Sequence, residues 1–275
     1  MSIVNKISQT VPMQHDTIFS PYKASQFDYA LGFLAQKGFT GVELAITYPD
    51  KVDDQALLLK LSSAGLVATT LSTGQAYGYA NVFLASSDKD VRSNAINFII
   101  GHINLSAKLD RPPVTIGLLR GKLEDDRNDI LLQNLSLALE PCINHATRMG
   151  IMLQIEPINR GETTMLNNIE ETLQFLSTIG NPENVGILYD TYHSYKEDGN
   201  MAEAIKIAGQ KITNVHFADS HRGFPGFGEI EFTHVVNALN EIGYKGAYTL
   251  ETLSIPDANF INDNYHNFIT MMLNE

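Results

Sequence analysis

The sequence predicts an α/β protein with a single (β/α)8 TIM barrel, in which eight parallel strands are surrounded by helices. Three observations lead to this prediction. Eight short apolar segments alternate with eight helical segments along the chain. The chain has 275 residues, and one barrel of this kind typically takes about 250. No linker, low-complexity run or change of composition divides residues 1–275, so we expect one domain.

The first half of the chain contains four of these strand and helix pairs. Apolar and often β-branched segments indicate strands at residues 1–13, 41–46, 66–71 and 114–119. Apolar residues at helical spacing indicate helices at residues 24–37, 52–64, 91–107 and 129–148. A capping box that begins at Ser87 marks the start of the third helix. The polar segment 72–77 is expected to be a loop near a ligand.

The second half repeats the alternation four more times. Strands are expected at residues 151–156, 185–188, 212–217 and 247–250. Helices are expected at residues 169–179, 201–208, 233–242 and 258–273. The segment 185–188 is continuously apolar, which is typical of a strand that is buried on both faces. Barrel strands are buried in this way, because helices cover the outside and side chains fill the inside.

Four ionisable side chains stand at the ends of four consecutive predicted strands. They are Glu156, Asp190, His216 and Glu251. Because the carboxyl ends of barrel strands surround the active site, we expect these side chains to meet at one mouth. Three carboxylates and one imidazole suit a divalent cation such as Mn²⁺, Co²⁺ or Mg²⁺. The sequence therefore predicts one metal site.

The alternative is that each acid pairs with a nearby basic side chain. The cations close to these positions in the sequence are Arg160 and Arg222, which are too few to neutralise three acids. Around the metal we expect Glu162, His193 and Arg222. His193 lies three residues after Asp190, in a predicted loop, where its ring can donate a hydrogen bond to a substrate oxygen. A surface histidine is the other interpretation of His193.

Composition favours a small-molecule substrate. Lys and Arg number 19 against 31 Asp and Glu, which gives a net charge of −12 and disfavours binding to nucleic acid. Cys142 is the only cysteine, so an intrachain disulfide is excluded. We find no basic leader and no apolar run of about 18 residues, the length that a membrane span needs. We therefore expect a cytoplasmic protein that does not bind membranes.

Four motifs resemble the xylose isomerase-like TIM-barrel superfamily of sugar isomerases and epimerases, and within it the tagatose/psicose 3-epimerase group. They are Ile155-Glu-Pro-Ile-Asn-Arg-Gly-Glu162, Asp190-Thr-Tyr-His193, Val215-His-Phe-Ala-Asp-Ser-His-Arg222 followed by Pro225-Gly226, and Leu250-Glu251. The resemblance covers nearly the whole chain. It implies a sugar substrate, a homo-oligomer and one divalent metal ion, Mn²⁺ ahead of Co²⁺ or Mg²⁺. The implied metal ligands are Glu156, Asp190, His216 and Glu251, and the implied substrate contacts are Glu162, His193 and Arg222.

Two further motifs resemble the branch that contains 5-keto-L-gluconate epimerase. They are Ser72-Thr-Gly-Gln-Ala-Tyr77 and Ile116-Gly-Leu-Leu-Arg-Gly121. This resemblance makes Gln75 and Arg120 further candidates for substrate contact, with Arg120 as the partner of a substrate carboxylate. The chain departs from the common pattern after His193, where Ser194-Tyr195 replace Met-Asn, and around Gly223-Phe224. Both segments flank the expected pocket, so the identity of the sugar stays open.

The resemblance implies an epimerase of a ketose or keto-acid sugar. Glu156 and Glu251 would remove a proton beside the ketone from one face of the sugar and return it to the other, through an enediolate. An aldose-ketose isomerase uses the same chemistry and is the alternative. A sugar-binding protein without turnover is more remote. A nuclease similar to endonuclease IV would need further histidines at the early strands, where this chain has Glu43 and Arg120.

Overall fold

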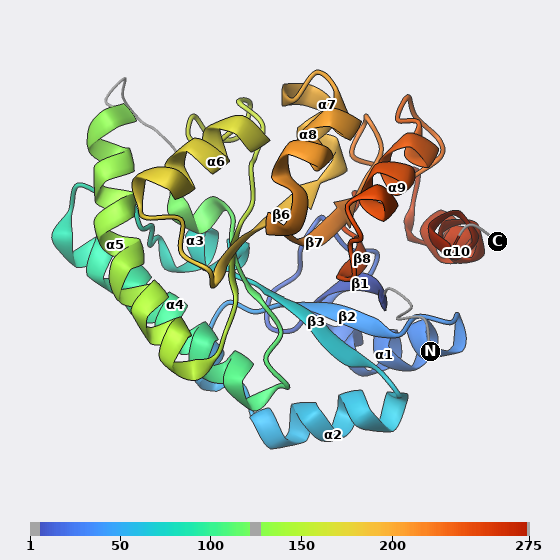
Figure 1. Ribbon diagram of the computed structural model, residues 1–275. Helices are drawn as coiled ribbons and strands as arrows, with labels where there is room; N and C mark the ends of the chain where they lie inside the picture. The colour runs from blue at the N-terminus through green and yellow to red at the C-terminus, as the bar shows by residue number, and fades with distance from the viewer. Residues whose placement is uncertain (1–5, 122–127, 274–275) are drawn as a thin grey trace.

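The computed structural model describes residues 6–121 and 128–273. Its eight strands form a closed barrel in the order β1 to β8, and every neighbouring pair is parallel. Helices surround this barrel (Figure 1). The predicted (β/α)8 architecture is therefore confirmed. In the part of the chain that the structure describes, no helix is both long and apolar enough to cross a bilayer.

The barrel strands are short and almost entirely buried. They are β1 (Lys6–Pro12), β2 (Gly41–Ala45), β3 (Val67–Ser72), β4 (Val114–Ile116), β5 (Leu153–Ile155), β6 (Val185–Asp190), β7 (Ile212–Phe217) and β8 (Ala247–Leu250). Because β6 is buried on both faces, its apolar residues follow one another along the strand and do not alternate with polar residues.

The helices lie between the strands and bury one face each against them. They are α1 (Phe27–Gln36), α2 (Asp54–Ala64), α3 (Gly74–Ala80), α4 (Lys89–Lys108), α5 (Asn128–Met149), α6 (Ile169–Thr178), α7 (Thr191–Glu197), α8 (Met201–Ala208), α9 (Phe232–Glu241) and α10 (Ala258–Leu273). Short 3-10 turns are η1 (Ala24–Gln26), η2 (Pro49–Lys51), η3 (Leu118–Arg120) and η4 (Gly209–Lys211).

Three local predictions were wrong. Residues 74–80 form helix α3, although segment 72–77 was expected to be a loop. The cap of α4 is Asp88 and not Ser87, because the Asp88 carboxylate accepts hydrogen bonds from the backbone N–H groups of Asp90 and Val91. His193 lies in helix α7 and not in a loop.

Strand register brings the carboxyl ends of β5 to β8 to one level. Asp190 at the end of β6 pairs with His216 of β7, and His216 pairs with Thr249 of β8. Glu156 directly follows β5, and Glu251 directly follows β8. The closed barrel thus presents these four side chains at the same mouth.

Candidate active site

The four predicted metal ligands form one compact buried cluster. Each of Glu156, Asp190, His216 and Glu251 offers one ligand atom, and these atoms all lie within 4.8 Å of one another. Nδ1 of the buried His216 ring has no hydrogen-bond partner among the described residues. Unpaired buried polar atoms are costly, so this donor set fits a bound cation.

Glu43 fixes the orientation of the His216 ring. Nε2 of His216 lies 2.8 Å from Oε2 of the fully buried Glu43, and Thr10 donates a hydrogen bond to the other Glu43 oxygen at 3.2 Å. Nε2 of His216 therefore carries a proton toward Glu43, and Nδ1 faces the three acids, where its lone pair is available to a metal when the ring is neutral. Sequence reasoning did not include Glu43 among the site residues. The available signal was a carboxylate inside a buried strand without a nearby cation in the sequence.

Arg222 is the cation that reaches this cluster. Its Nη1 lies 3.1 Å from Oδ2 of Asp190, and its Nη2 lies 2.5 Å from Oε2 of Glu251. The guanidinium is itself buried and stacks within 4.9 Å of the ring centroids of Phe19 and Tyr192. Arg222 is therefore held rigidly between the acids and the mouth of the barrel.

These contacts separate the pKa values of the carboxyl groups. Burial and the negative charge of Glu251 raise the pKa of Glu156 to about 8. Burial also opposes ionisation of Glu251, but the positive charges of His216 and Arg222 outweigh it and lower the Glu251 pKa. For Asp190, burial is likewise outweighed by Arg222, and the pKa lies below its usual range. Burial would lower the pKa of His216, but Glu43 and Glu251 raise it well above its ordinary value.

Four of the predicted substrate contacts line a cavity of about 260 Å³ at the barrel mouth. They are Gln75, Glu162, His193 and Arg222, and Glu156 and Glu251 line the same cavity. Nε2 of His193 lies 2.9 Å from Nη1 of Arg222 and 3.9 Å from Oε1 of Glu156. Burial lowers the pKa of His193 to about 3, so its imidazole is neutral. The amide of Gln75 is already engaged by the Thr47 hydroxyl and the His15 carbonyl.

Arg120 does not reach this cavity. Its side chain is fully buried, and its guanidinium donates hydrogen bonds to the backbone carbonyls of Gly117, Glu156, Met165 and Leu166 at 2.7–3.2 Å. Burial lowers its pKa to about 10, which still leaves it charged. This placement disagrees with the predicted contact between Arg120 and a substrate carboxylate. The guanidinium instead holds the segments after β4 and β5 together.

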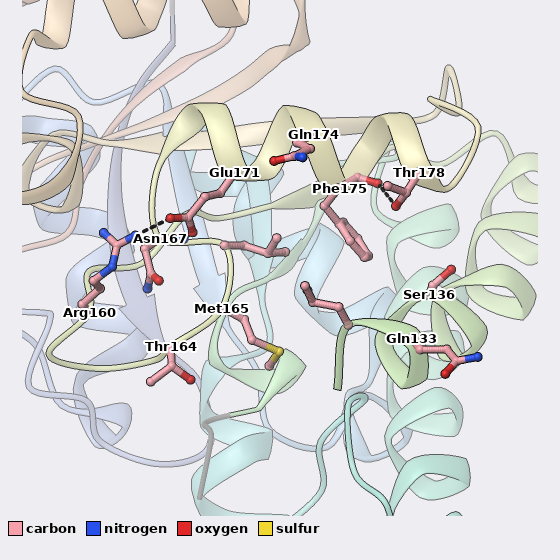
Figure 2. Close-up of a pocket in the computed structure, with 12 residues that line it drawn as sticks. Gln133, Ser136, Arg160, Thr164, Met165, Asn167, Glu171, Gln174, Phe175 and Thr178 are labelled. Atoms are coloured by element: carbon pink, nitrogen blue, oxygen red, sulfur yellow. Dashed lines mark hydrogen bonds and ion pairs between the residues drawn. The ribbon is translucent and has the colours of Figure 1, made fainter. Parts of the chain in front are cut away.

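A second cavity, of about 590 Å³, lies between α5, α6 and the segment that precedes α6 (Figure 2). Arg160 and Glu171 form an ion pair at one end of it. Arg160 also pairs with Glu197 of α7, so it does not neutralise the acidic cluster. None of the four clustered ligands lines this cavity. The smaller cavity at the barrel mouth is therefore the candidate active site.

Comparison with known families and relatives agrees with this geometry. The family described as the xylose isomerase-like TIM barrel matches residues 31–264. An L-ribulose 3-epimerase of Mesorhizobium japonicum is 28% identical over 244 residues, which are 87% of this chain and 80% of the relative. A ketose 3-epimerase of Arthrobacter globiformis is 27% identical over 236 residues, which are 85% of this chain and 80% of the relative.

A solved structure of L-ribulose 3-epimerase superposes with a TM-score of 0.85 at 24% identity. The match covers 98% of this chain and 95% of that one. At this identity the superposition supports the fold alone. Evidence about the chemistry comes from the sequence relatives and from the cluster of four buried side chains.

Proposed function

Because the chain belongs to the xylose isomerase-like TIM barrel family, we propose that it is a divalent-metal-dependent epimerase that inverts the carbon beside the ketone of a sugar. The observation that carries this proposal is the buried cluster of three carboxylates and one imidazole, two of whose members also line the substrate-sized cavity. Relatives named as ketose 3-epimerases support the same reaction class.

The residues that would hold the metal are Glu156, Asp190, His216 and Glu251. When bound, a divalent cation would supply Lewis-acid stabilisation of negative charge on the sugar oxygens. The oxygen-rich donor set with one imidazole favours Mn²⁺, with Co²⁺ or Mg²⁺ as alternatives. Glu43 would keep the His216 ring in the ligating orientation.

The proton transfer is assigned to Glu156 and Glu251. Both carboxylates line the cavity, and both remain slightly exposed, at 8% and 9%. Their opposite pKa shifts suit a pair in which one group accepts a proton while the other donates one. If the two act from opposite faces of the sugar, the stereocentre is inverted. If a proton returns to the adjacent carbon, the product is an aldose, which is the alternative isomerase activity.

The charges that line the cavity favour a neutral sugar. Asp16, Glu156, Glu162 and Glu251 contribute carboxyl groups, whereas Arg222 is the single Lys or Arg among the described lining residues. Arg222 is already paired with Asp190 and Glu251. Arg120 is occupied by backbone carbonyls. A keto-acid sugar or a ketose phosphate would therefore bring its negative charge to a site without a free cation among those residues.

Product analysis with a panel of substrates tests this function. Chelator-treated protein is supplied with Mn²⁺ and incubated with L-ribulose, D-psicose, 5-keto-L-gluconate and a ketose phosphate, and the sugars are separated by chromatography. We expect an epimeric ketose from a neutral member of the panel and none without metal. Preferential turnover of the acid or phosphate would contradict the charge argument, and an aldose product would favour the isomerase.

We also propose an oligomeric state and a cellular location for the protein on the basis of its sequence. The family resemblance suggests a homo-oligomer, which analytical ultracentrifugation of the purified protein tests. The single cysteine, which is buried in α5, suggests a cytoplasmic location. A nuclease function is disfavoured, because the net charge is −12 and the ligand cluster contains a single histidine.

A further inference from the structure

Asn159 joins the two side chains that we assign to sugar binding. It follows β5 by four residues and is 4% exposed. Its Nδ2 donates hydrogen bonds to Nδ1 of His193 at 2.8 Å and to Oε1 of Glu162 at 2.9 Å. Its Oδ1 accepts a hydrogen bond from the backbone N–H of Gly161 at 2.9 Å. Every polar atom of this amide is therefore used inside the site.

The direction of the Asn159 amide is fixed by partners whose roles are unambiguous. The Gly161 backbone N–H is only a donor, so the atom that faces it must be the amide oxygen. The Glu162 carboxylate is an acceptor when ionised, so the atom that faces it must be the amide nitrogen. Reversing the amide would lose both hydrogen bonds. Since the nitrogen also faces His193, Nδ1 of that ring must accept.

The His193 proton is consequently placed on Nε2. A second donor, the backbone N–H of Asn159, also faces Nδ1 at 3.3 Å. In the opposite tautomer Nε2 would accept a hydrogen bond from Arg222, 2.9 Å away. That gain of one bond would place the Nδ1–H against both Asn159 donors, and the amide could relieve this only by turning away from Gly161 and Glu162. The Nε2–H tautomer loses the one hydrogen bond from Arg222 to Nε2 but keeps the two hydrogen bonds that Asn159 donates to Nδ1.

We propose that Asn159 is a positioning residue that keeps His193 as an Nε2–H donor toward a sugar oxygen and holds Glu162 beside it as an acceptor. This inference rests on the proposed epimerase function for its catalytic consequence. The tautomer itself follows from the hydrogen bonds alone. Nε2 lies 2.9 Å from Nη1 of Arg222 and 3.9 Å from Oε1 of Glu156, so the donor lies beside the proton-transferring carboxylate.

The outer side of the same segment provides a matched control. Arg160, the next residue, turns outward and pairs with Glu171 of α6 at the cavity that Figure 2 shows. Glu171 lines that cavity and not the barrel mouth. Glu171→Gln therefore weakens the external attachment of the segment without changing a hydrogen bond of Asn159. If the role of Asn159 were purely structural, a variant of Asn159 should behave like Glu171→Gln.

Nitrogen-15 NMR of the histidine rings tests the proposal directly. Two-bond proton–nitrogen spectra of chelator-treated, ¹⁵N-histidine-labelled protein identify the protonated nitrogen of each ring, and the His193→Gln spectrum assigns the His193 signals. We expect protonation of His193 at Nε2 in the unmodified protein and in Glu171→Gln. In Asn159→Asp, the new carboxylate should attract a proton to Nδ1. Protonation of His193 at Nδ1 in the unmodified protein would overturn the proposal.

Activity then tests the consequence. Loss of one preorganised donor typically lowers kcat by about 10²–10³-fold, which is the decrease expected for Asn159→Asp. Glu171→Gln should change kcat by less than about fivefold, as expected for an exposed ion pair. Asn159→Asp with the original tautomer and unchanged kcat would refute the positioning role. If the unmodified protein showed the Nε2–H tautomer but turned over no sugar, the proposed function would fail while the tautomer assignment stood.

Discussion

Replacing Glu43 by glutamine should weaken metal binding by about 10–100-fold while the fold is retained. Glu43 does not belong to the ligand cluster, but its carboxylate lies 2.8 Å from Nε2 of His216 in a fully buried position. Glutamine preserves the shape and an acceptor oxygen and removes the negative charge that makes the imidazole a stronger ligand. The expected increase in Kd corresponds to about 1.4–2.7 kcal/mol of binding free energy.

The sign of the pH dependence follows from the His216 pKa. Glu43 helps to raise that pKa, so its loss also weakens the competition between protons and metal for Nδ1. The difference between the variant and the unmodified protein should therefore be largest at alkaline pH and shrink as the pH falls. Isothermal titration calorimetry with Mn²⁺ on chelator-treated protein measures both effects. Glu241→Gln, which removes an exposed ion pair with Lys206, is the control.

Equal Mn²⁺ affinities of Glu43→Gln and the unmodified protein at alkaline pH would refute the role of Glu43. A variant that binds metal normally but loses turnover would place Glu43 in the chemistry and not in the support of His216. A variant that is unfolded by circular dichroism would be replaced by Glu43→Asp, which keeps the charge but shortens the reach to Nε2. That variant should fall between glutamine and the unmodified protein.

Three other predictions concern the carboxyl groups. Glu251→Gln should abolish turnover and leave the melting temperature within a few degrees of the original by scanning calorimetry; retained full activity would reject Glu251 as a proton carrier. Glu156→Gln should stabilise the metal-free protein at neutral pH. Because the Glu156 pKa is raised from 4.5 to about 8, the protonated Glu156 side chain contributes fully to stability at acidic pH, and this contribution is lost as the pH rises between these two values. The loss, and so the gain from the variant, should reach up to about 3 kcal/mol at pH 7. Urea titrations of the variant and the unmodified protein at acidic and neutral pH measure this gain. A stability difference between the two proteins that is the same at both pH values would contradict the prediction. Metal affinity of the unmodified protein should fall as the pH drops below about 8, because Glu156 and His216 must release protons to bind; a pH-independent Kd would show that neither proton competes.

The strands and the grouping of Glu156, Asp190, His216 and Glu251 at one mouth were predictable because their signals are local. An apolar segment such as 185–188 indicates a buried strand, and the barrel places the residues that end neighbouring strands at one mouth. Helix α7 was missed, since it has only seven residues and follows β6 directly. Its cap is Asp190, the last residue of β6, whose carboxylate accepts hydrogen bonds from the backbone N–H groups of Tyr192 and His193. The same carboxylate is thus both a helix cap and a predicted ligand.

The parts of the site that were not predictable depend on contacts across the barrel. Glu43 and His216 are separated by 173 positions in the sequence, and no local pattern relates them. Arg120 matched a motif, but the 3-10 turn η3 directs its guanidinium to backbone carbonyls and away from the cavity. A motif gives the residue type, whereas the direction of the side chain is set by the turn that carries it.

Deuterium exchange is the measurement that tests the proposed chemistry most directly. Mn²⁺-loaded protein is incubated in D₂O with the ketose that it converts, or with L-ribulose and D-psicose in turn, and the sugars are examined by NMR after the metal is removed. We expect deuterium at the carbon beside the ketone in the inverted epimer, and no exchange with Glu251→Gln or with chelator-treated protein. Inversion without deuterium, exchange that persists without metal, or no exchange with Mn²⁺, Co²⁺ or Mg²⁺ would contradict it.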